Sequence, residues 1–354
     1  MKKIVLTGGG TAGHVTPNIA LLPSLKEAGF EIYYIGSKEG IEKQLIENLG
    51  IPYYGISSGK LRRYFSWKNF TDPFRVLKGC REAKKIMKEV KPDVVFSKGG
   101  FVTVPVVRAA GKCKVPVVCH ESDMTPGLAN RIGMRYATKI CCNFPETLPK
   151  LKGKGIHTGT PIRQELFTGS REAGLSFVGL SADKPVILVV GGSTGALRVN
   201  EAVRGILPEL LKEYQVIHLC GKGKTDPSFD GTPGYVQMEY CDKEMKDLFA
   251  AADIVISRAG ANAICELLAL RKPNLLIPLS AEASRGDQIL NAASFEKQGF
   301  SMVLQEEEIT KEKLLAKVQE LFAKKDEYTK TMSESETGDA VKTIVGLLNG
   351  FVKQ

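Results

Sequence analysis

The stretch Ile4-Val5-Leu6-Thr7-Gly8-Gly9-Gly10-Thr11-Ala12-Gly13-His14 decides the fold class of this chain. Its apolar beginning has the length and composition of a short buried strand, and the glycines that follow end that strand in a tight turn. A helical pattern over residues 17–28 comes next. Strand, glycine turn and helix in this order are typical of α/β domains that bind a ligand at the end of the strand.

The same alternation continues through the first half of the chain. Strand-like runs cover residues 3–7, 31–35, 93–97, 115–120 and 138–144, and helical patterns lie between them, for example over 17–28 and 76–90. This alternation predicts βαβ units and a parallel sheet. Runs as apolar as Val94-Val95-Phe96 predict that helices cover both faces of the sheet.

The second half begins again in the same style. Val189-Val190-Gly191-Gly192-Ser193-Thr194-Gly195-Ala196 resembles Leu6-Thr7-Gly8-Gly9-Gly10-Thr11-Ala12-Gly13, and each follows the first strand of its half. Strand-like runs cover 186–190, 215–220, 235–239, 254–257 and 274–279, and helical patterns cover 243–252, 262–270, 288–297, 311–323 and 339–351. We therefore predict an α/β fold of two doubly wound domains, with parallel sheets that face each other across a cleft and a join near Gly159-Thr160-Pro161.

The composition agrees with two cytoplasmic globular domains. The 354 residues exceed one ordinary core, and 43% are hydrophobic and 25% charged. No apolar run approaches the ~18 residues that span a bilayer, and the apolar start is too short for a signal peptide. None of the eight cysteines forms a C-x-x-C pair. We therefore expect free thiols, mostly buried, rather than a zinc site.

The net charge of +10 is shared unevenly between the two halves. Residues 1–162 hold 26 Lys and Arg against 12 Asp and Glu, whereas residues 163–354 hold 23 against 27. The segment 60–91 alone has eleven basic residues, and it interleaves them with Tyr64, Phe65, Trp67, Phe70 and Phe74. An anionic membrane surface, single-stranded nucleic acid, or simply a solvated helix face over a core aromatic cluster would each account for this pattern.

The glycine turn of the first half formally matches G-x-G-x-x-G at Gly8, Gly10 and Gly13. A dinucleotide site also needs an acidic residue at the end of the second strand, where it binds ribose. That strand ends Tyr34-Ile35-Gly36-Ser37 without one, and Glu31 lies at its other end. A nicotinamide cofactor is therefore disfavoured. A turn needed only for packing remains possible, but His14 beside the glycines favours a reactive site.

The glycine turn of the second half is a second candidate phosphate site. Backbone N–H groups of residues 191–195 and the Ser193 hydroxyl are suited to a diphosphate. No Gly-Lys-Ser/Thr follows, so the turn is not a P-loop, and no Asp-x-Asp occurs in the chain. The usual acidic pair that chelates a divalent ion on a diphosphate is thus missing, and we expect no bound metal and no cofactor.

Three further segments carry polar groups at strand ends. Ser257-Arg258-Ala259-Gly260-Ala261-Asn262-Ala263-Ile264-Cys265-Glu266 places Glu266 where it can accept both hydroxyls of a ribose, or act on the helix dipole. Gln288 and Asn291 share a helix face and suit sugar hydroxyls or solvent. His120-Glu121-Ser122-Asp123 ends an apolar strand, and a His beside carboxylates suits general base work better than metal binding.

These motifs together resemble a known family, the MurG-type N-acetylglucosaminyltransferases that convert lipid I to lipid II in peptidoglycan synthesis. The resemblance runs nearly end to end. Its most specific parts are Gly8-Gly9-Gly10-Thr11-Ala12-Gly13-His14-Val15, Lys98-Gly99-Gly100-Phe101-Val102, His120-Glu121-Ser122-Asp123, Gly159-Thr160-Pro161-Ile162-Arg163, Gly191-Gly192-Ser193-Thr194-Gly195-Ala196 with Asn200, Arg258-Ala259-Gly260-Ala261, and Asp287-Gln288.

The resemblance implies a GT-B fold of two Rossmann-like domains and a role for each part of the chain. Residues 1–162 would bind acceptor and membrane, 163–336 would bind UDP-N-acetylglucosamine, and the helix in 337–354 would pack back on the first domain. On the donor side, Ser193 would meet the diphosphate, Arg163 the nucleotide, the backbone near Cys241 the uracil, Glu266 the ribose and Gln288 the sugar. The other donor positions implied are Asn200, Arg258, Ala261, Asn262, Ala263, Ile264 and Cys265. Thr11, Ala12, Gly13 and His14 would line the acceptor side, with Asn130 nearby.

The chain departs from the family pattern at three positions. The family often has Gln and Asn where this chain has Ser122 and Asp123, and often Tyr where it has Phe101. Asp123 is therefore a carboxylate at a position that frequently contacts the donor sugar as an amide. The resemblance implies inversion at the anomeric carbon and release of UDP. We expect His14 to be the base, with Asp123, Glu121 and His120 as rivals.

The implied partners are UDP-N-acetylglucosamine, lipid I, anionic phospholipid at the cytoplasmic face of the membrane, and the cell-wall and division machinery, but not nucleic acid. The nearest alternative is a related glycosyltransferase that acts on diacylglycerol or a small aglycone. A UDP-N-acetylglucosamine epimerase, a dehydrogenase and a basic nucleic-acid-binding module are more distant alternatives. The last of these leaves three strand-to-helix glycine loops unexplained.

Overall fold

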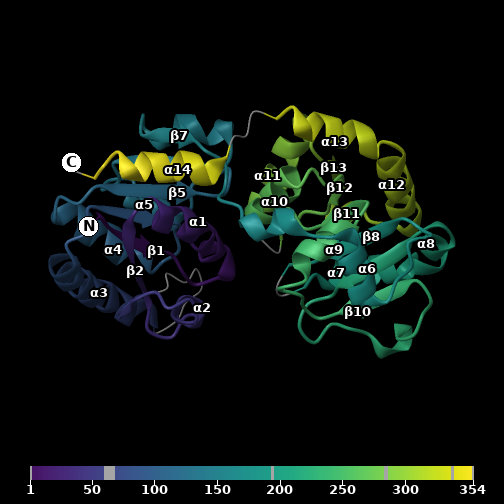
Figure 1. Ribbon diagram of the computed structural model, residues 1–354, viewed down its shortest axis with the longest axis horizontal. Helices are drawn as coiled ribbons and strands as arrows, with labels where there is room; N and C mark the ends of the chain where they lie inside the picture. Colours follow the sequence, from purple (N-terminus) through teal and green to yellow (C-terminus); the bar gives the residue numbers. More distant parts are fainter. Residues whose placement is uncertain (1, 60–67, 193–194, 283–285, 336–338, 353–354) are drawn as a thin grey trace. The chain divides into compact units, whose positions relative to one another are not determined.

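The computed structural model describes residues 2–59, 68–192, 195–282, 286–335 and 339–352, of which residues 68–73 are described by their backbone alone (Figure 1). The chain forms two compact units. Unit 1 comprises Met1–Arg163 and Thr337–Gln354, and unit 2 comprises Gln164–Glu336. The first crossing from one unit to the other lies one residue beyond the expected boundary.

Unit 1 is built on a seven-stranded parallel sheet with the order β3-β2-β1-β4-β5-β6-β7. The strands are β1 (Lys2–Thr7), β2 (Phe30–Ser37), β3 (Tyr53–Ile56), β4 (Val94–Ser97), β5 (Val117–Glu121), β6 (Lys139–Cys142) and β7 (Gly155–His157). The strand order reverses between β1 and β4. In open α/β sheets ligands bind at such a switch point, beyond the carboxyl ends of the strands.

Helices cover both faces of this sheet, as its apolar strands require. They are α1 (Thr16–Glu27), α2 (Ile41–Glu47), α3 (Lys68–Val90), α4 (Thr103–Lys112), α5 (Leu128–Gly133) and α14 (Ala340–Asn349), with 3-10 turns η1 (Ala12–His14) and η2 (Pro145–Leu151). One core joins α3, α4 and α5 to the sheet, and the other joins α1, α2 and α14 to its opposite face. The last helix, α14, packs against α1.

Unit 2 repeats this plan with six parallel strands in the order β10-β9-β8-β11-β12-β13. They are β8 (Val186–Val190), β9 (Gln215–Leu219), β10 (Tyr235–Met238), β11 (Ile254–Ser257), β12 (Asn274–Leu276) and β13 (Met302–Val303). The helices are α6 (Arg171–Val178), α7 (Leu197–Gly205), α8 (Leu207–Glu213), α9 (Met245–Ala251), α10 (Ala261–Ala269), α11 (Asp287–Lys297), α12 (Lys311–Ala323) and α13 (Lys325–Ser333), with 3-10 turns η3 (Gln164–Thr168), η4 (Pro227–Phe229) and η5 (Glu306–Glu308). The switch point here lies between β8 and β11.

The predicted fold class, two doubly wound Rossmann-like domains with parallel sheets, is confirmed. All ten predicted strands are present, and three more, β3, β7 and β13, were not predicted. They lie at sheet edges and have four, three and two residues, too few for a periodic signal. The cleft expected between the two domains stays a prediction.

Neither a candidate membrane-spanning helix nor a candidate metal cluster is found among the described residues. No helix among them is long and apolar enough to cross a membrane. No group of three or more His, Cys, Asp or Glu side chains is placed to hold a metal ion in the described part of the chain. All eight cysteines are free, six of them buried. The predicted Ser193, and the basic and aromatic residues of 60–67, lie outside the described residues.

Candidate active site

The glycine turn after β1 is closed so tightly that its glycines cannot be replaced without movement. A Cβ atom added to Gly8 would lie 2.2 Å from the His14 carbonyl oxygen, and one added to Gly10 would lie 2.7 Å from the Phe101 ring. Gly10 also has a φ of +89°, which favours glycine. The turn therefore folds back on its own 3-10 helix η1 and rests on the loop that follows β4.

His14 lies at the switch point of unit 1, against that same loop. Cβ atoms built on Gly99 and Gly100 would lie 3.7 and 3.3 Å from the imidazole ring. The ring forms a hydrogen bond with the main chain of Lys98. Its Nδ1 atom is buried and has no hydrogen-bond partner in the part of the chain that the structure describes. The imidazole thus has one nitrogen bonded to the main chain and one buried nitrogen without a partner among the described residues.

The surroundings keep this imidazole neutral at physiological pH. Desolvation of the ring, followed by the positive charge of Lys98, lowers the pKa of His14 from 6.5 to about 4. The hydrogen bond to the Lys98 main chain and the negative charge of Glu42 oppose the shift. A neutral imidazole with an unoccupied nitrogen is the form that a general base requires.

Glu42 reaches the glycine turn from α2, although it belongs to none of the predicted site motifs. Its Oε2 accepts a hydrogen bond from the Gly10 N–H (3.2 Å), and its Oε1 accepts bonds from the Ser37 N–H (3.0 Å) and hydroxyl (2.5 Å). An acid does therefore sit at the end of β2, but it comes from the following helix. A Glu in the first turn of a helix that starts at the sheet's carboxyl edge was the available signal.

His120, at the end of β5, has both ring nitrogens engaged. Nδ1 lies 2.8 Å from Lys98 Nζ and Nε2 lies 2.9 Å from the Gly159 carbonyl oxygen. The ammonium can only donate and the carbonyl can only accept, so His120 is the neutral tautomer that carries its proton on Nε2. Burial, and then the charge of Lys98, lower the pKa of His120 well below its ordinary value. His120 thus has no nitrogen to offer a substrate.

Lys98 is a second residue at this site for which the motifs predicted no role. It follows the buried strand β4 and is itself buried. Besides His120, its ammonium donates to the hydroxyls of Ser122 (2.6 Å) and Thr160 (3.3 Å). A charged residue directly after a fully apolar strand was the signal in the sequence.

Glu121 shapes the loop between β5 and α5. Its carboxylate accepts hydrogen bonds from the N–H groups of Asp123 (3.1 Å) and Gly127 (2.9 Å) and from the amide of Asn130 (2.9 Å). Burial raises the pKa of Glu121. The Asn130 amide also donates to the His120 carbonyl oxygen (3.0 Å). The structure thus gathers these residues and His14 at the carboxyl ends of β1, β4 and β5, with Asp123 half-buried.

The glycine turn after β8 in unit 2 is closed in the same way. A Cβ on Gly191 would lie 2.7 Å from the Ala196 nitrogen, and one on Gly195 would lie 2.1 Å from the Cys220 carbonyl oxygen. Gly195 has a φ of +69°. Helix α7 begins directly after the turn, so its first N–H groups are directed at the carboxyl edge of the sheet.

Asn200, predicted to bind substrate, lies inside unit 2 behind this turn. Its carboxamide donates to the Cys220 carbonyl oxygen (2.9 Å) and lies 3.1 Å from His218 Nε2. His218 Nδ1 lies 2.9 Å from the Tyr235 hydroxyl. Asn200 and His218 are fully buried. The geometry indicates that Asn200 holds α7 against β9, and therefore supports the glycine turn from the rear.

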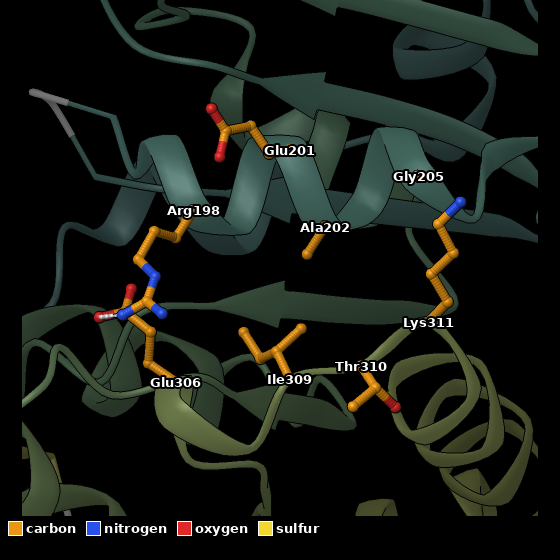
Figure 2. A pocket seen from close by; sticks show the side chains of 8 residues that line it. All are labelled: Arg198, Glu201, Ala202, Gly205, Glu306, Ile309, Thr310 and Lys311. Atoms are coloured by element: carbon orange, nitrogen blue, oxygen red, sulfur yellow. Dashed lines mark ion pairs between the residues drawn. The ribbon is translucent and has the colours of Figure 1, made fainter.

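Arg258 also supports loops of unit 2 through its hydrogen bonds. Its guanidinium donates to the carbonyl oxygens of Ile277 (3.2 Å) and Pro278 (3.3 Å) and to the carboxylate of Glu306. The buried Glu306 also lies 3.8 Å from Arg198 of α7. Figure 2 shows these two side chains meeting at one end of a groove of about 370 Å³. Arg258 thus connects the loops after β11, β12 and β13.

Arg163, expected on the donor side, ends the first stretch of unit 1, whereas the remaining described donor-side residues lie on loops and helices that follow β10, β11 and β12. Glu266 is half-buried in the second turn of α10, and the first turn holds no acid. A helix-capping role for Glu266 is thereby weakened, because capping acids lie in the first turn. Asn262 and Ala263 are half-buried on α10, whereas Ala261, Ile264 and Cys265 are buried, as is Cys241 after β10. Gln288 accepts a hydrogen bond from the Leu279 N–H (3.0 Å).

Two Rossmann-like domains with closed glycine turns and a neutral histidine at one switch point suit a nucleotide-dependent enzyme such as a glycosyltransferase. The family models agree with this class. Residues 4–142 match the glycosyltransferase family 28 N-terminal domain, and residues 186–345 match the family 28 C-terminal domain. The chain belongs to glycosyltransferase family 28, which confirms the resemblance predicted from the motifs.

Named relatives match over the whole chain. The "UDP-N-acetylglucosamine--N-acetylmuramyl-(pentapeptide) pyrophosphoryl-undecaprenol N-acetylglucosamine transferase" of Lachnospira eligens is 69% identical over 98% of this chain and 99% of its own length. The protein of the same name from Lachnoclostridium phytofermentans is 67% identical over 98% of each chain. The crystal structure of Acinetobacter baumannii MurG is 25% identical, with a TM-score of 0.77 over 99% of this chain and 100% of that chain.

Proposed function

We propose that this enzyme transfers N-acetylglucosamine from UDP-N-acetylglucosamine to the C4 hydroxyl of the muramyl sugar in lipid I, and so forms lipid II for peptidoglycan synthesis. The observation that carries this proposal is the 69% identity, over 98% of the chain, to a transferase named for that reaction. Membership of glycosyltransferase family 28 supports the reaction class.

In this reaction the acceptor hydroxyl oxygen attacks the anomeric carbon from the face opposite the diphosphate. The carbon–oxygen bond to UDP breaks, and the configuration at that carbon inverts. The hydroxyl proton passes to His14, whose imidazole is neutral at physiological pH. Backbone N–H groups of the turn after β8 stabilise the negative charge that develops on the leaving diphosphate.

The hydrogen bonds favour His14 over its rivals as the base. His120 has a donor on one nitrogen and an acceptor on the other. The Glu121 carboxylate receives three hydrogen bonds from its own loop and from Asn130. Asp123 is half-buried beside them and is the second choice. Replacing His14 with Ala should lower kcat by roughly 10²–10⁴-fold, the usual range for a general base.

The donor is assigned to unit 2 together with Arg163, the last residue before the chain enters that unit, and the acceptor is assigned to unit 1. Glu266 would hold the ribose hydroxyls, Gln288 the transferred sugar and the backbone near Cys241 the uracil. Ser193 would meet the diphosphate and Arg163 the nucleotide. Asn130, together with Thr11, Ala12 and Gly13, would line the acceptor site beside His14. Asn200 and Arg258 act through the loops that they support, as their hydrogen bonds indicate.

The outer face of α3 supports peripheral binding to anionic phospholipid at the cytoplasmic face of the membrane. The helix packs on the sheet through Ala83, Met87 and Val90. Its exposed residues include six cations, Arg75, Lys78, Arg81, Lys84, Lys85 and Lys88, and two large apolar side chains, Phe74 and Leu77. Cations around exposed apolar groups are suited to a headgroup layer. Contacts with the cell-wall and division machinery stay a prediction.

One assay tests the reaction against its alternatives. Purified protein, without added metal, is given labelled UDP-N-acetylglucosamine together with lipid I or diacylglycerol. Label on lipid I alone supports the proposal, and label on diacylglycerol alone contradicts it. Isomerised sugar without any acceptor would instead indicate an epimerase. Flotation with anionic and neutral liposomes, beside a gel shift with single-stranded DNA at physiological salt, tests the assignment of the basic face.

A further inference from the structure

Glu42 occupies a space that three glycines leave open. Cβ atoms added to Gly9 and Gly40 would lie 2.5 and 2.2 Å from its carboxylate, and one added to Gly36 would lie 2.9 Å from its Cγ. The side chain is fully buried, and its oxygens accept bonds from Gly10 and Ser37. One carboxylate thus ties the turn after β1 to the turn after β2. Because its oxygens are used in this way, Glu42 is not available to a ribose.

Lys98 joins the loop after β4 to other segments in a comparable way. Its ammonium bonds to groups from β5 and from the segment that leads out of unit 1, namely His120, Ser122 and Thr160. Its main chain meets the His14 ring, and the two glycines that follow it lie against that ring. The loop that forms one wall of the His14 site is therefore held in place by the Lys98 side chain.

The two side chains also act on His14 through their charges, in opposite directions. The positive charge of Lys98 lowers the pKa of His14, and the negative charge of Glu42 raises it. The neighbouring strand β5 contributes His120, which is neutral, and Glu121, whose oxygens are engaged with its own loop and with Asn130. Lys98 and Glu42 are thus the charged groups that act directly on the imidazole.

We propose that Glu42 and Lys98 are positioning residues for His14, whose side chains clamp the two loops around the imidazole and hold one negative and one positive charge in fixed places beside it. The inference rests on the proposed function, in which His14 is the base. It adds to that function two residues that do not touch the substrate. A purely structural role would make both residues matter for stability, but would not give their replacements opposite effects on the titration of His14.

The experiment measures the titration of His14 directly, by NMR of protein labelled with ¹⁵N-histidine. The chain has four histidines, and the signal missing from His14→Gln identifies the one required. Lys98→Met removes the positive charge at nearly constant volume, and should raise the pKa of His14 from about 4 toward, but not above, 6.5. Adding Glu42→Gln to that variant should lower it again. The acid limb of kcat/KM should move in the same two directions.

The position of the loops is read from the kinetics. A Gln at position 42 must place its NH₂ group against an N–H of Gly10 or of Ser37, because both donate to the carboxylate. Glu42→Gln should therefore lower kcat by roughly 10-fold or more, with the KM for UDP-N-acetylglucosamine unchanged. Glu42→Asp keeps the charge but has a shorter side chain. In the Lys98→Met background it should therefore leave the pKa of His14 as high as in Lys98→Met alone, and still lower kcat. It also replaces Glu42→Gln if that variant does not fold.

Two exposed positions supply matched controls. Glu47→Gln on α2 and Lys26→Met on α1 make the same charge changes at the surface, and should leave the His14 titration where it is. Absence of opposite shifts in the Lys98→Met and Lys98→Met/Glu42→Gln proteins would overturn the inference. If the NMR shifts occur but the acid limb stays in place, the inference stands and the assignment of His14 as the base is wrong.

Discussion

A single methyl group added at Gly100 should disturb the catalytic geometry as well as the stability of the fold. It follows β4 with a φ of +90°. A Cβ there would lie 2.2 Å from the Gly9 carbonyl oxygen and 3.3 Å from His14 Cδ2. Cβ contacts under 3.0 Å essentially do not occur, so the two loops must separate by at least the difference, 0.8 Å. Gly100→Ala should therefore displace His14.

The magnitude follows from two contributions. An Ala with positive φ costs about 1–2 kcal/mol of backbone strain. The overpacking against Gly9 adds about 1–3 kcal/mol. Gly50→Ala is the matched control, because Gly50 has a φ of +68° with nothing within 4 Å of the added Cβ. Gly50→Ala should therefore lose unfolding free energy only through the backbone strain.

Urea denaturation and steady-state kinetics test this reasoning together. Gly100→Ala should lose about 2–5 kcal/mol of unfolding free energy and Gly50→Ala about 1–2 kcal/mol. A displacement near 1 Å at the reacting group should reduce kcat by ~10²-fold in Gly100→Ala, whereas Gly50→Ala should keep the parental kcat. Parental kcat in folded Gly100→Ala would refute the role of the turn in placing His14.

Three further predictions concern the donor site, a buried network and pH. Glu266→Ala should raise the KM for UDP-N-acetylglucosamine and change kcat much less; initial rates at varied donor decide this, and an unchanged KM would remove Glu266 from the site. Asn200→Ala leaves the Cys220 carbonyl oxygen and His218 Nε2 without their partner, so unfolding free energy should fall by roughly 1–3 kcal/mol, and an unchanged urea midpoint would contradict this. The folded pKa of His14, about 4, lies below its ordinary 6.5, so the unfolded state takes up the proton first. Stability should therefore fall as pH falls from 6.5 to 4, by at most about 3 kcal/mol from this residue, and His14→Gln should flatten that dependence.

The fold class and the family of this protein could be predicted from the order of its residues. The strands β1, β4 and β8 are short apolar runs followed at once by glycine, polar or charged residues, and helical patterns separate them. That alternation predicts the doubly wound class because only parallel strands joined by helices bury such runs on both faces. The family resemblance was also carried by local motifs, and both family models match it.

The roles of individual residues were less accessible from sequence. Asn200 and Arg258 stand in motifs, yet the fold directs their side chains to backbone groups inside unit 2. Glu42 and Lys98 stood outside the list of candidates, yet both act on His14. The edge strands β3, β7 and β13 were missed because two to four residues carry no period.

The fold class, the positions of the glycine turns and the kinds of polar group at the strand ends follow from the order of the residues, because they depend on local periodicity and on backbone conformations that glycine permits. Which of those polar groups bond to each other, and which histidine nitrogen has no partner among the described residues, depends on the folded arrangement of the chain. The physical reason is that hydrogen bonds and desolvation depend on distances between residues far apart in the chain. Glu42 meets Gly10, and Lys98 meets Thr160, only after the sheet has brought their loops to one edge.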